Sequence, residues 1–158
     1  MLFGQNIWDP WLIIAQIGIM QSSFYLLTGF WLVFLQTLVP GASTPTLSHL
    51  LSASIMDLDV AVSIVPVLAL FFSAPLCAVI CAHVVDRAWQ CLDFSGTVYF
   101  LHLIACTVHS GFPLYWEWWL ANGLSMTIMV LLSEYWLVKK EQQPIEMDKM
   151  LSAMTHKV

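Results

Sequence analysis

The sequence predicts an all-α fold, a polytopic membrane protein built as a bundle of four transmembrane helices. Of its 158 residues, 59% are hydrophobic and only 9% are charged. Soluble domains carry about 25% charged residues, so a water-soluble fold of this size would lack the charges to cover its surface. No Asp, Glu, Lys or Arg occurs from Pro10 to Met56. The chain is therefore expected to lie in a lipid bilayer.

Four apolar segments have about the length needed to cross a hydrocarbon core of about 30 Å as helices. A transmembrane domain at 1–140 is expected to contain them, and a short cytosolic tail at 141–158 to follow. The four spans are predicted at about 11–39, 60–85, 94–112 and 116–138. Asp9-Pro10 is typical of a helix start, because Asp accepts bonds from free N–H groups and Pro needs no donor there. The first span is longer than a straight crossing requires, which indicates tilt or a bend.

The second span combines prolines with a stripe of small residues. Pro66 and Pro75 predict kinks. Ala74, Ala78 and Ala82 recur every four residues, a spacing that lets another helix approach closely. We interpret this stripe as a packing surface.

The third and fourth spans are predicted to form a tight hairpin. The intervening residues 111–115 contain Gly and Pro, which are typical of a turn. Trp116, Trp118 and Trp119 follow directly, where an interfacial aromatic belt is expected.

The basic residues predict the orientation in the membrane. With four spans, all of them fall on the side of the N-terminus; they are Arg87, Lys139, Lys140, Lys149 and Lys157. Cytosolic loops carry an excess of Lys and Arg. Both termini and the loop 86–93 are therefore predicted to be cytosolic.

A polar stripe runs along the third span. At about 100° per residue, Ser95, Tyr99, His102, Cys106 and His109 share one face. Polar groups in a bilayer need internal partners, so this face is expected to point into the bundle. The residues expected to form interhelical polar contacts are Gln16, Gln21, Tyr99, His102, Cys106, His109, Asn122 and Glu134. The alternative for Glu134 is snorkelling of its carboxylate to the interface near Lys139 and Lys140.

The same stripe raises an alternative function, a small four-helix membrane carrier or a metal or redox protein using His102, Cys106 and His109. The two histidines are about 10.5 Å apart along the helix axis, too far for one ion with bonds of about 2.1 Å. No metal site and no cofactor are therefore predicted. The sequence also has no catalytic Ser/His/Asp motif, phosphate-binding glycine loop or basic patch with aromatics. No enzyme activity, small-molecule substrate or nucleic acid is expected.

Two longer stretches carry a resemblance to a known family. "WDPWLIIAQIGIMQSSFY" (Trp8 to Tyr25) and "QCLDFSGTVYFLHLIAC" (Gln90 to Cys106) resemble the SYS family of Golgi integral membrane proteins. Shorter matches follow in the same order at 112–113, 118–120 and 134–135, whereas the loop between the first two spans does not match. The family pattern is more basic beside Gln90, where this chain has only Arg87.

The resemblance implies a four-span, non-catalytic membrane protein of the trans-Golgi. It implies a receptor for an Arf-like small GTPase whose N-terminus is acetylated instead of myristoylated. The recruited GTPase would in turn support vesicle tethering and protein trafficking.

A GTPase must dock from the cytosol, where this chain offers only short segments. The candidate contacts lie in the loop before the third span and in the N-terminal segment; they are Arg87, Gln90, Cys91, Asp93, Phe94, Trp8 and Asp9. The alternative role for these residues is helix capping and interfacial anchoring. Cys91 is also a candidate for palmitoylation at the membrane edge.

Overall fold

The computed structural model of the chain describes residues 10–38, 47–51, 64–85 and 88–155. The elements are α1 (Pro10–Leu38), α2 (Leu47–Leu51), α3 (Ile64–Val84), the 3-10 turn η2 (Ala88–Gln90), α4 (Cys91–Ser110) and α5 (Trp116–Thr155). Within these ranges there is no strand. Among the described residues, four helices are long and apolar enough to cross a membrane: α1, α3, α4 and the Trp116–Lys140 part of α5. The predicted all-α fold with four spans is confirmed.

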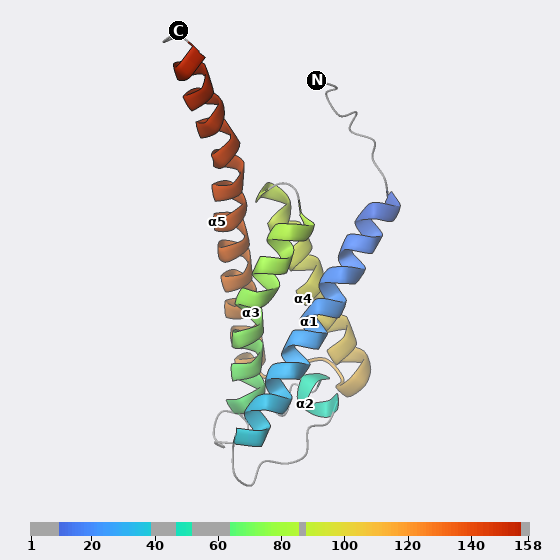
Figure 1. Cartoon of the computed structure of the whole chain (residues 1–158). Helices are drawn as coiled ribbons and strands as arrows, with labels where there is room; N and C mark the ends of the chain where they lie inside the picture. Colours follow the sequence, from blue (N-terminus) through green and yellow to red (C-terminus); the bar gives the residue numbers. More distant parts are fainter. Residues whose placement is uncertain (1–9, 39–46, 52–63, 86–87, 156–158) are drawn as a thin grey trace.

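The helix α3 lies at the centre of the bundle. Its most extensive contacts are with α1 on one side and α5 on the other, while α4 packs against α5 and α1. In Figure 1, α1 begins and α5 extends outward at the same end, where α3 also meets α4. We call this end proximal. The opposite end, which holds α2 and the turn 111–115, we call distal.

Small side chains let α3 occupy this central position. Ala74 and Ala78 are fully buried and Ala82 nearly so, which places the predicted stripe inside the bundle. Pro66 lies in the first turn of α3, where its missing N–H removes no helical hydrogen bond. The helix then continues through Pro75 to Val84.

The hairpin between α4 and α5 turns at Gly111. Its φ of 88° is one that residues with a side chain rarely adopt, and its N–H donates to Thr107 O over 3.0 Å. Trp116 and Trp119 beyond the turn are exposed, as an interfacial belt requires, but Trp118 is only 2% exposed. Its ring stacks beside the His102 ring, with centroids 6.1 Å apart. The expectation of three interfacial tryptophans was therefore wrong for Trp118, which turns into the core.

The fourth long helix does not end where the apolar sequence ends. The span was predicted at 116–138, yet α5 continues to Thr155 and has 40 residues. At about 1.5 Å per residue it is about 60 Å long, roughly twice the hydrocarbon thickness. Most of the predicted tail at 141–158 therefore continues the same helix and projects from the proximal end (Figure 1).

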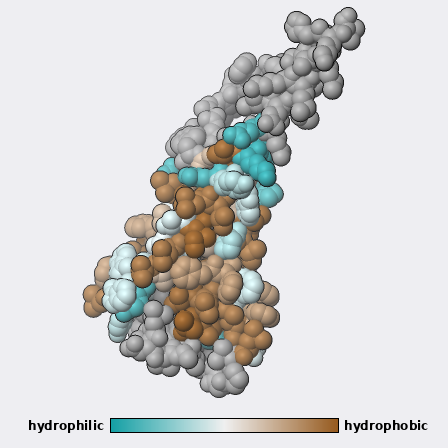
Figure 2. Space-filling model, turned by 90° about the vertical axis from the view of Figure 1, so that its left-hand side faces the viewer, coloured by the Kyte–Doolittle hydropathy of each residue, from teal (hydrophilic) through white to brown (hydrophobic). Residues whose placement is uncertain are grey.

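The outer surface of the bundle is apolar. Large exposed side chains occur on every long helix, among them Leu26, Phe30, Phe72, Val108 and Leu131. The face of the bundle shown in Figure 2 is mostly brown, and the largest group of hydrophilic residues lies toward the end from which α5 extends. Such a surface is suited to lipid and unsuited to water.

Candidate functional site

A chain of hydrogen bonds in the core joins all four spans. The Thr28 hydroxyl on α1 shares its one hydrogen between Phe24 O, 2.7 Å away, and Ser73 Oγ on α3, 3.1 Å away. Ser73 donates to Leu70 O over 2.8 Å. Ser125 on α5 donates to the same Leu70 carbonyl over 3.2 Å. The hydroxyl oxygen of Tyr99 on α4 lies 2.7 Å from Ser125 Oγ. Because the Ser125 hydrogen is directed at Leu70 O, the Tyr99 hydroxyl donates to Ser125. We call Thr28, Ser73, Leu70, Ser125 and Tyr99 the core chain.

Sequence reasoning included Tyr99 but missed its partners on the other helices. Ser73 and Ser125 are fully buried. Ser73 is a single small polar residue in a long apolar run, and Ser125 lies between Asn122 and Thr127. In lipid, a serine on a buried helix face favours contact with a second helix, because its side chain is small and can form a hydrogen bond to that helix. Their proximity depends on how the helices pair, which no local pattern reveals.

The polar stripe of α4 is buried over most of its length. Ser95, Tyr99, His102 and Cys106 are all buried, whereas His109 is exposed. His109 lies in the last turn of α4, past the part that packs against the other spans. The expectation that His109 points into the bundle was therefore wrong.

The buried histidine is surrounded mainly by aromatic rings. His102 Nε2 lies 3.6 Å from Cys106 Sγ, and the ring packs edge-on against Phe24 with centroids 5.3 Å apart. The described residues contain no group of three or more His, Cys, Asp or Glu side chains placed to hold one metal ion. The alternative hypothesis of a carrier or redox site needed His109 beside His102 and Cys106, and the structure does not bring the three together.

Polar residues predicted on α1 and α5 bond to backbone carbonyls. Gln16 Nε2 donates to Val84 O, the last carbonyl of α3, over 2.9 Å. Asn122 Nδ2 donates to Trp118 O within α5 over 2.9 Å. Gln21 lies beside Tyr25, one turn further along α1, and Glu134 is half-buried. The Gln16 bond therefore joins α1 to α3, whereas the Asn122 bond stays within α5.

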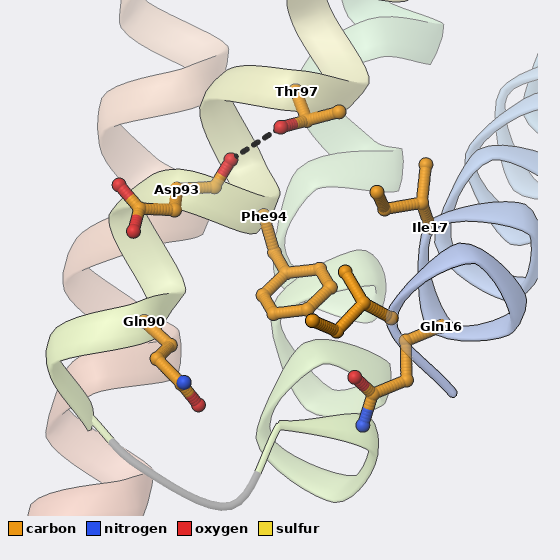
Figure 3. Close-up of a pocket in the computed structure, with 7 residues that line it drawn as sticks. Gln16, Ile17, Gln90, Asp93, Phe94 and Thr97 are labelled. Atoms are coloured by element: carbon orange, nitrogen blue, oxygen red, sulfur yellow. Dashed lines mark hydrogen bonds between the residues drawn. The ribbon is translucent and has the colours of Figure 1, made fainter. Parts of the chain in front are cut away.

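A pocket of about 250 Å³ lies at the proximal end between α1 and α4. We call it the proximal pocket; its lining residues are Ile13, Gln16, Ile17, Gln90, Asp93, Phe94 and Thr97. In Figure 3 the Phe94 ring points from α4 toward α1, while Asp93 extends from the other side of α4. Ile17 and Phe94 are half-buried and supply apolar walls. Gln16 and Gln90 add amide groups beside them.

Local contacts hold the two walls of the proximal pocket in place. The bond from Gln16 to Val84 O ties the first turns of α1 to the end of α3. On the other wall, Cys91 is 0% exposed and packs in the hydrophobic core, which anchors the start of α4. Thr97 Oγ1 donates to Asp93 O over 2.7 Å, as Figure 3 shows, which occupies both groups within α4.

The structure divides the candidate docking residues into three groups. Gln90, Asp93 and Phe94 line the proximal pocket. Cys91 lies between them in the sequence but is fully buried, so the expectation that it contacts a partner or carries an acyl chain does not fit its position. Trp8, Asp9 and Arg87 lie outside the described residues.

The α1 wall of the pocket was missed by the sequence reasoning. Its residues Ile13, Gln16 and Ile17 are spaced at three and four, so they share one helix face. This spacing was the available signal. Gln16 was instead expected to bond inside the bundle.

Comparison with known proteins gives a consistent assignment along nearly the whole chain. A family model described as "SYS1: Integral membrane protein S linking to the trans Golgi network" matches residues 3–147. The Protein SYS1 homolog of Nematostella vectensis is 31% identical over 144 residues, which cover 91% of this chain and 90% of that protein. The Protein SYS1 homolog of Dictyostelium discoideum is 30% identical over 149 residues, 94% of this chain and 63% of that protein. No solved structure shows a significant match.

Proposed function

Because the chain belongs to the SYS1 family of Golgi-linked integral membrane proteins, we propose that it is a trans-Golgi receptor that recruits an Arf-like small GTPase from the cytosol. The bound GTPase would then support vesicle tethering and protein trafficking. In this proposal the protein itself carries out no catalysis. Its part is to provide a docking site at the membrane surface.

The proximal pocket is the observation that supports this proposal most directly. It lies at the end where α1 begins and α5 projects, which the basic residues predict to be cytosolic. Three of the candidate docking residues, Gln90, Asp93 and Phe94, line it. A protein arriving from the cytosol would reach this pocket without crossing the bilayer.

The chemistry of the pocket suits the acetylated N-terminal segment that the resemblance implies for the GTPase. Acetylation removes the ammonium charge, so burial of that terminus does not require a charge to leave water. The acetyl methyl group would pack against Ile17 and Phe94. The adjacent carbonyl oxygen would accept a hydrogen bond from the Gln90 amide. The exposed Asp93 carboxylate would meet basic side chains of the partner at the rim.

The test fills the pocket and measures recruitment. In cells lacking the endogenous protein, Ile17→Trp is expected to reduce the Golgi-bound fraction of an N-acetylated Arf-like GTPase by about tenfold, the effect of losing about 1.4 kcal/mol of binding free energy. The matched control is Ile19→Trp, because Ile19 lies on the same helix but is exposed and does not line the pocket. Fluorescence imaging gives the Golgi-bound fraction, and a Golgi marker checks that both variants reach the organelle. Equal recruitment by the two variants would refute the proposed docking site.

A further inference from the structure

A second hollow lies between α4 and α5, away from the proximal pocket. This groove measures about 230 Å³, and aromatic rings and glycines form much of its wall. The residues important here are Gly96, Phe100, Trp119, Asn122, Gly123 and Met126. Phe100 and Trp119 are exposed on the outer surface of the bundle, so the groove faces the bilayer. It takes no part in the proposed docking of a GTPase.

The two glycines keep this groove open. In membrane helices, glycine usually lets two backbones approach closely. At Gly123, however, an added methyl group would meet nothing within 4 Å, and at Gly96 it would meet only Met126 Cε, at 3.7 Å. Contact between α4 and α5 therefore does not require either glycine. Their effect is to leave a space that larger side chains would fill.

One polar atom beside the groove has no partner. Asn122 lines the groove and is 6% exposed, and its Nδ2 donates to Trp118 O. Its Oδ1 accepts no hydrogen bond from any residue that the structure describes. An unpaired acceptor is costly in hydrocarbon, where no water replaces the missing donor. The Oδ1 atom itself is buried, so a ligand with one hydroxyl group would supply the missing donor after a rotation of the Asn122 amide toward the groove.

These observations define the chemistry of the ligand. No charged side chain lines the groove, so nothing there pairs with a phosphate or an amine. Aromatic faces and open glycine positions suit a rigid apolar body, which loses less conformational entropy on binding than a flexible acyl chain. The single free acceptor at Asn122 suits one hydroxyl donor.

We propose that the groove between α4 and α5 binds a sterol. Its hydroxyl group donates to Asn122 Oδ1, about 9 Å along α5 from Trp116 at the distal end. The fused rings lie along Gly123 and Gly96 toward the proximal end. Phe100 packs against the ring system, and Trp119, about one turn nearer the distal end than Asn122, lies beside the hydroxyl end of the sterol. This site is independent of whether a GTPase docks at the proximal pocket.

The experiment uses the full-length protein in lipid nanodiscs with a photoactivatable cholesterol analogue. Wild type is expected to give saturable crosslinking that excess unlabelled cholesterol displaces, with adducts mapped by mass spectrometry to α4 and α5. Gly123→Leu, which fills the groove, is expected to lower crosslinking about tenfold. The matched control Gly18→Leu is expected to leave it unchanged, because Gly18 is exposed on α1 and also has nothing within 4 Å of an added methyl group.

A second variant tests the hydroxyl contact. Asn122→Leu removes the acceptor at similar volume and is expected to lower crosslinking roughly fivefold. A photoactivatable phosphatidylcholine should crosslink to wild type and Gly123→Leu equally. Unchanged sterol labelling in Asn122→Leu, adducts outside α4 and α5, or an equal loss of phosphatidylcholine labelling in Gly123→Leu would each overturn the proposal. If Gly123→Leu does not fold, Asn122→Leu and the adduct map on wild type still decide the question.

Discussion

The core chain and the proximal pocket both combine polar groups with apolar walls, but they use them in opposite ways. In the core chain, Tyr99 and Ser125 bond to each other at 2.7 Å, and Ser125 bonds on to Leu70 O. At the proximal pocket, Asp93 is exposed and Phe94 points toward a space of about 250 Å³. The first region satisfies its polar groups internally and holds helices together. The second presents unfilled apolar surface to whatever approaches the membrane. This contrast separates residues that determine stability from residues that determine binding.

The largest effect is expected from breaking the core chain at Ser125. Ser125→Ala leaves the buried Tyr99 hydroxyl without its acceptor, and an orphaned buried group costs about 1–3 kcal/mol. The free energy of unfolding, measured by denaturing-detergent titration in bicelles, should fall by about that amount. GTPase recruitment by the folded fraction should be unchanged. A fall in recruitment per folded molecule would mean that the two regions are not separate.

The next largest effect is expected at the proximal pocket. Phe94→Ala removes an apolar wall and should weaken recruitment about tenfold, corresponding to about 1.4 kcal/mol of binding free energy. The half-buried position of Phe94 predicts a smaller stability change than a fully buried aromatic would give. Fluorescence recovery of the Golgi-bound GTPase measures the binding change. Phe30→Ala is the control, because Phe30 is an exposed phenylalanine on the lipid-facing side of α1. Similar losses in both variants would contradict a specific role for Phe94.

The smallest effect is expected at Tyr99. Tyr99→Phe removes the donor but leaves Ser125 bonded to Leu70 O, so no described partner is orphaned. Interhelical hydrogen bonds of this kind contribute about 0.6 kcal/mol on average in membranes, and a loss of that size is expected. The double variant with Ser125→Ala should be more stable than Ser125→Ala alone, because no hydroxyl is then left unpaired. The same detergent titration measures this, and strictly additive losses would contradict the assigned direction of the hydrogen bond.

Much of the fold was predictable because membrane crossing leaves a strong local signal. Charge depletion and apolar length together indicate four spans, and Gly111 together with Pro113 indicates the turn between α4 and α5. The end of α5 was not predictable by the same signal. The apolar sequence ends near Lys139, but α5 continues to Thr155. A helix that has left the bilayer does not need an apolar sequence.

The candidate site was predictable only on one side. The block around Gln90 and Phe94 was identified from its place in the loop, but its counterpart on α1 depends on how α1 crosses the bundle. Cys91 shows the same limit. Asp93 is only two positions after Cys91, yet Cys91 is in the core and Asp93 is exposed, because two residues turn a helix by about 200°.

The length of α5 has a consequence for how any partner approaches. The part of α5 after Lys140, which continues to Thr155, extends roughly 20 Å beyond the membrane-spanning part at about 1.5 Å per residue. It leaves the bundle on the opposite side of α3 from α1, as Figure 1 shows. A protein seated at the proximal pocket would therefore meet a helical barrier on the flank where α5 projects. The projecting helix would limit the directions of approach and set the orientation in which a docked partner faces the membrane.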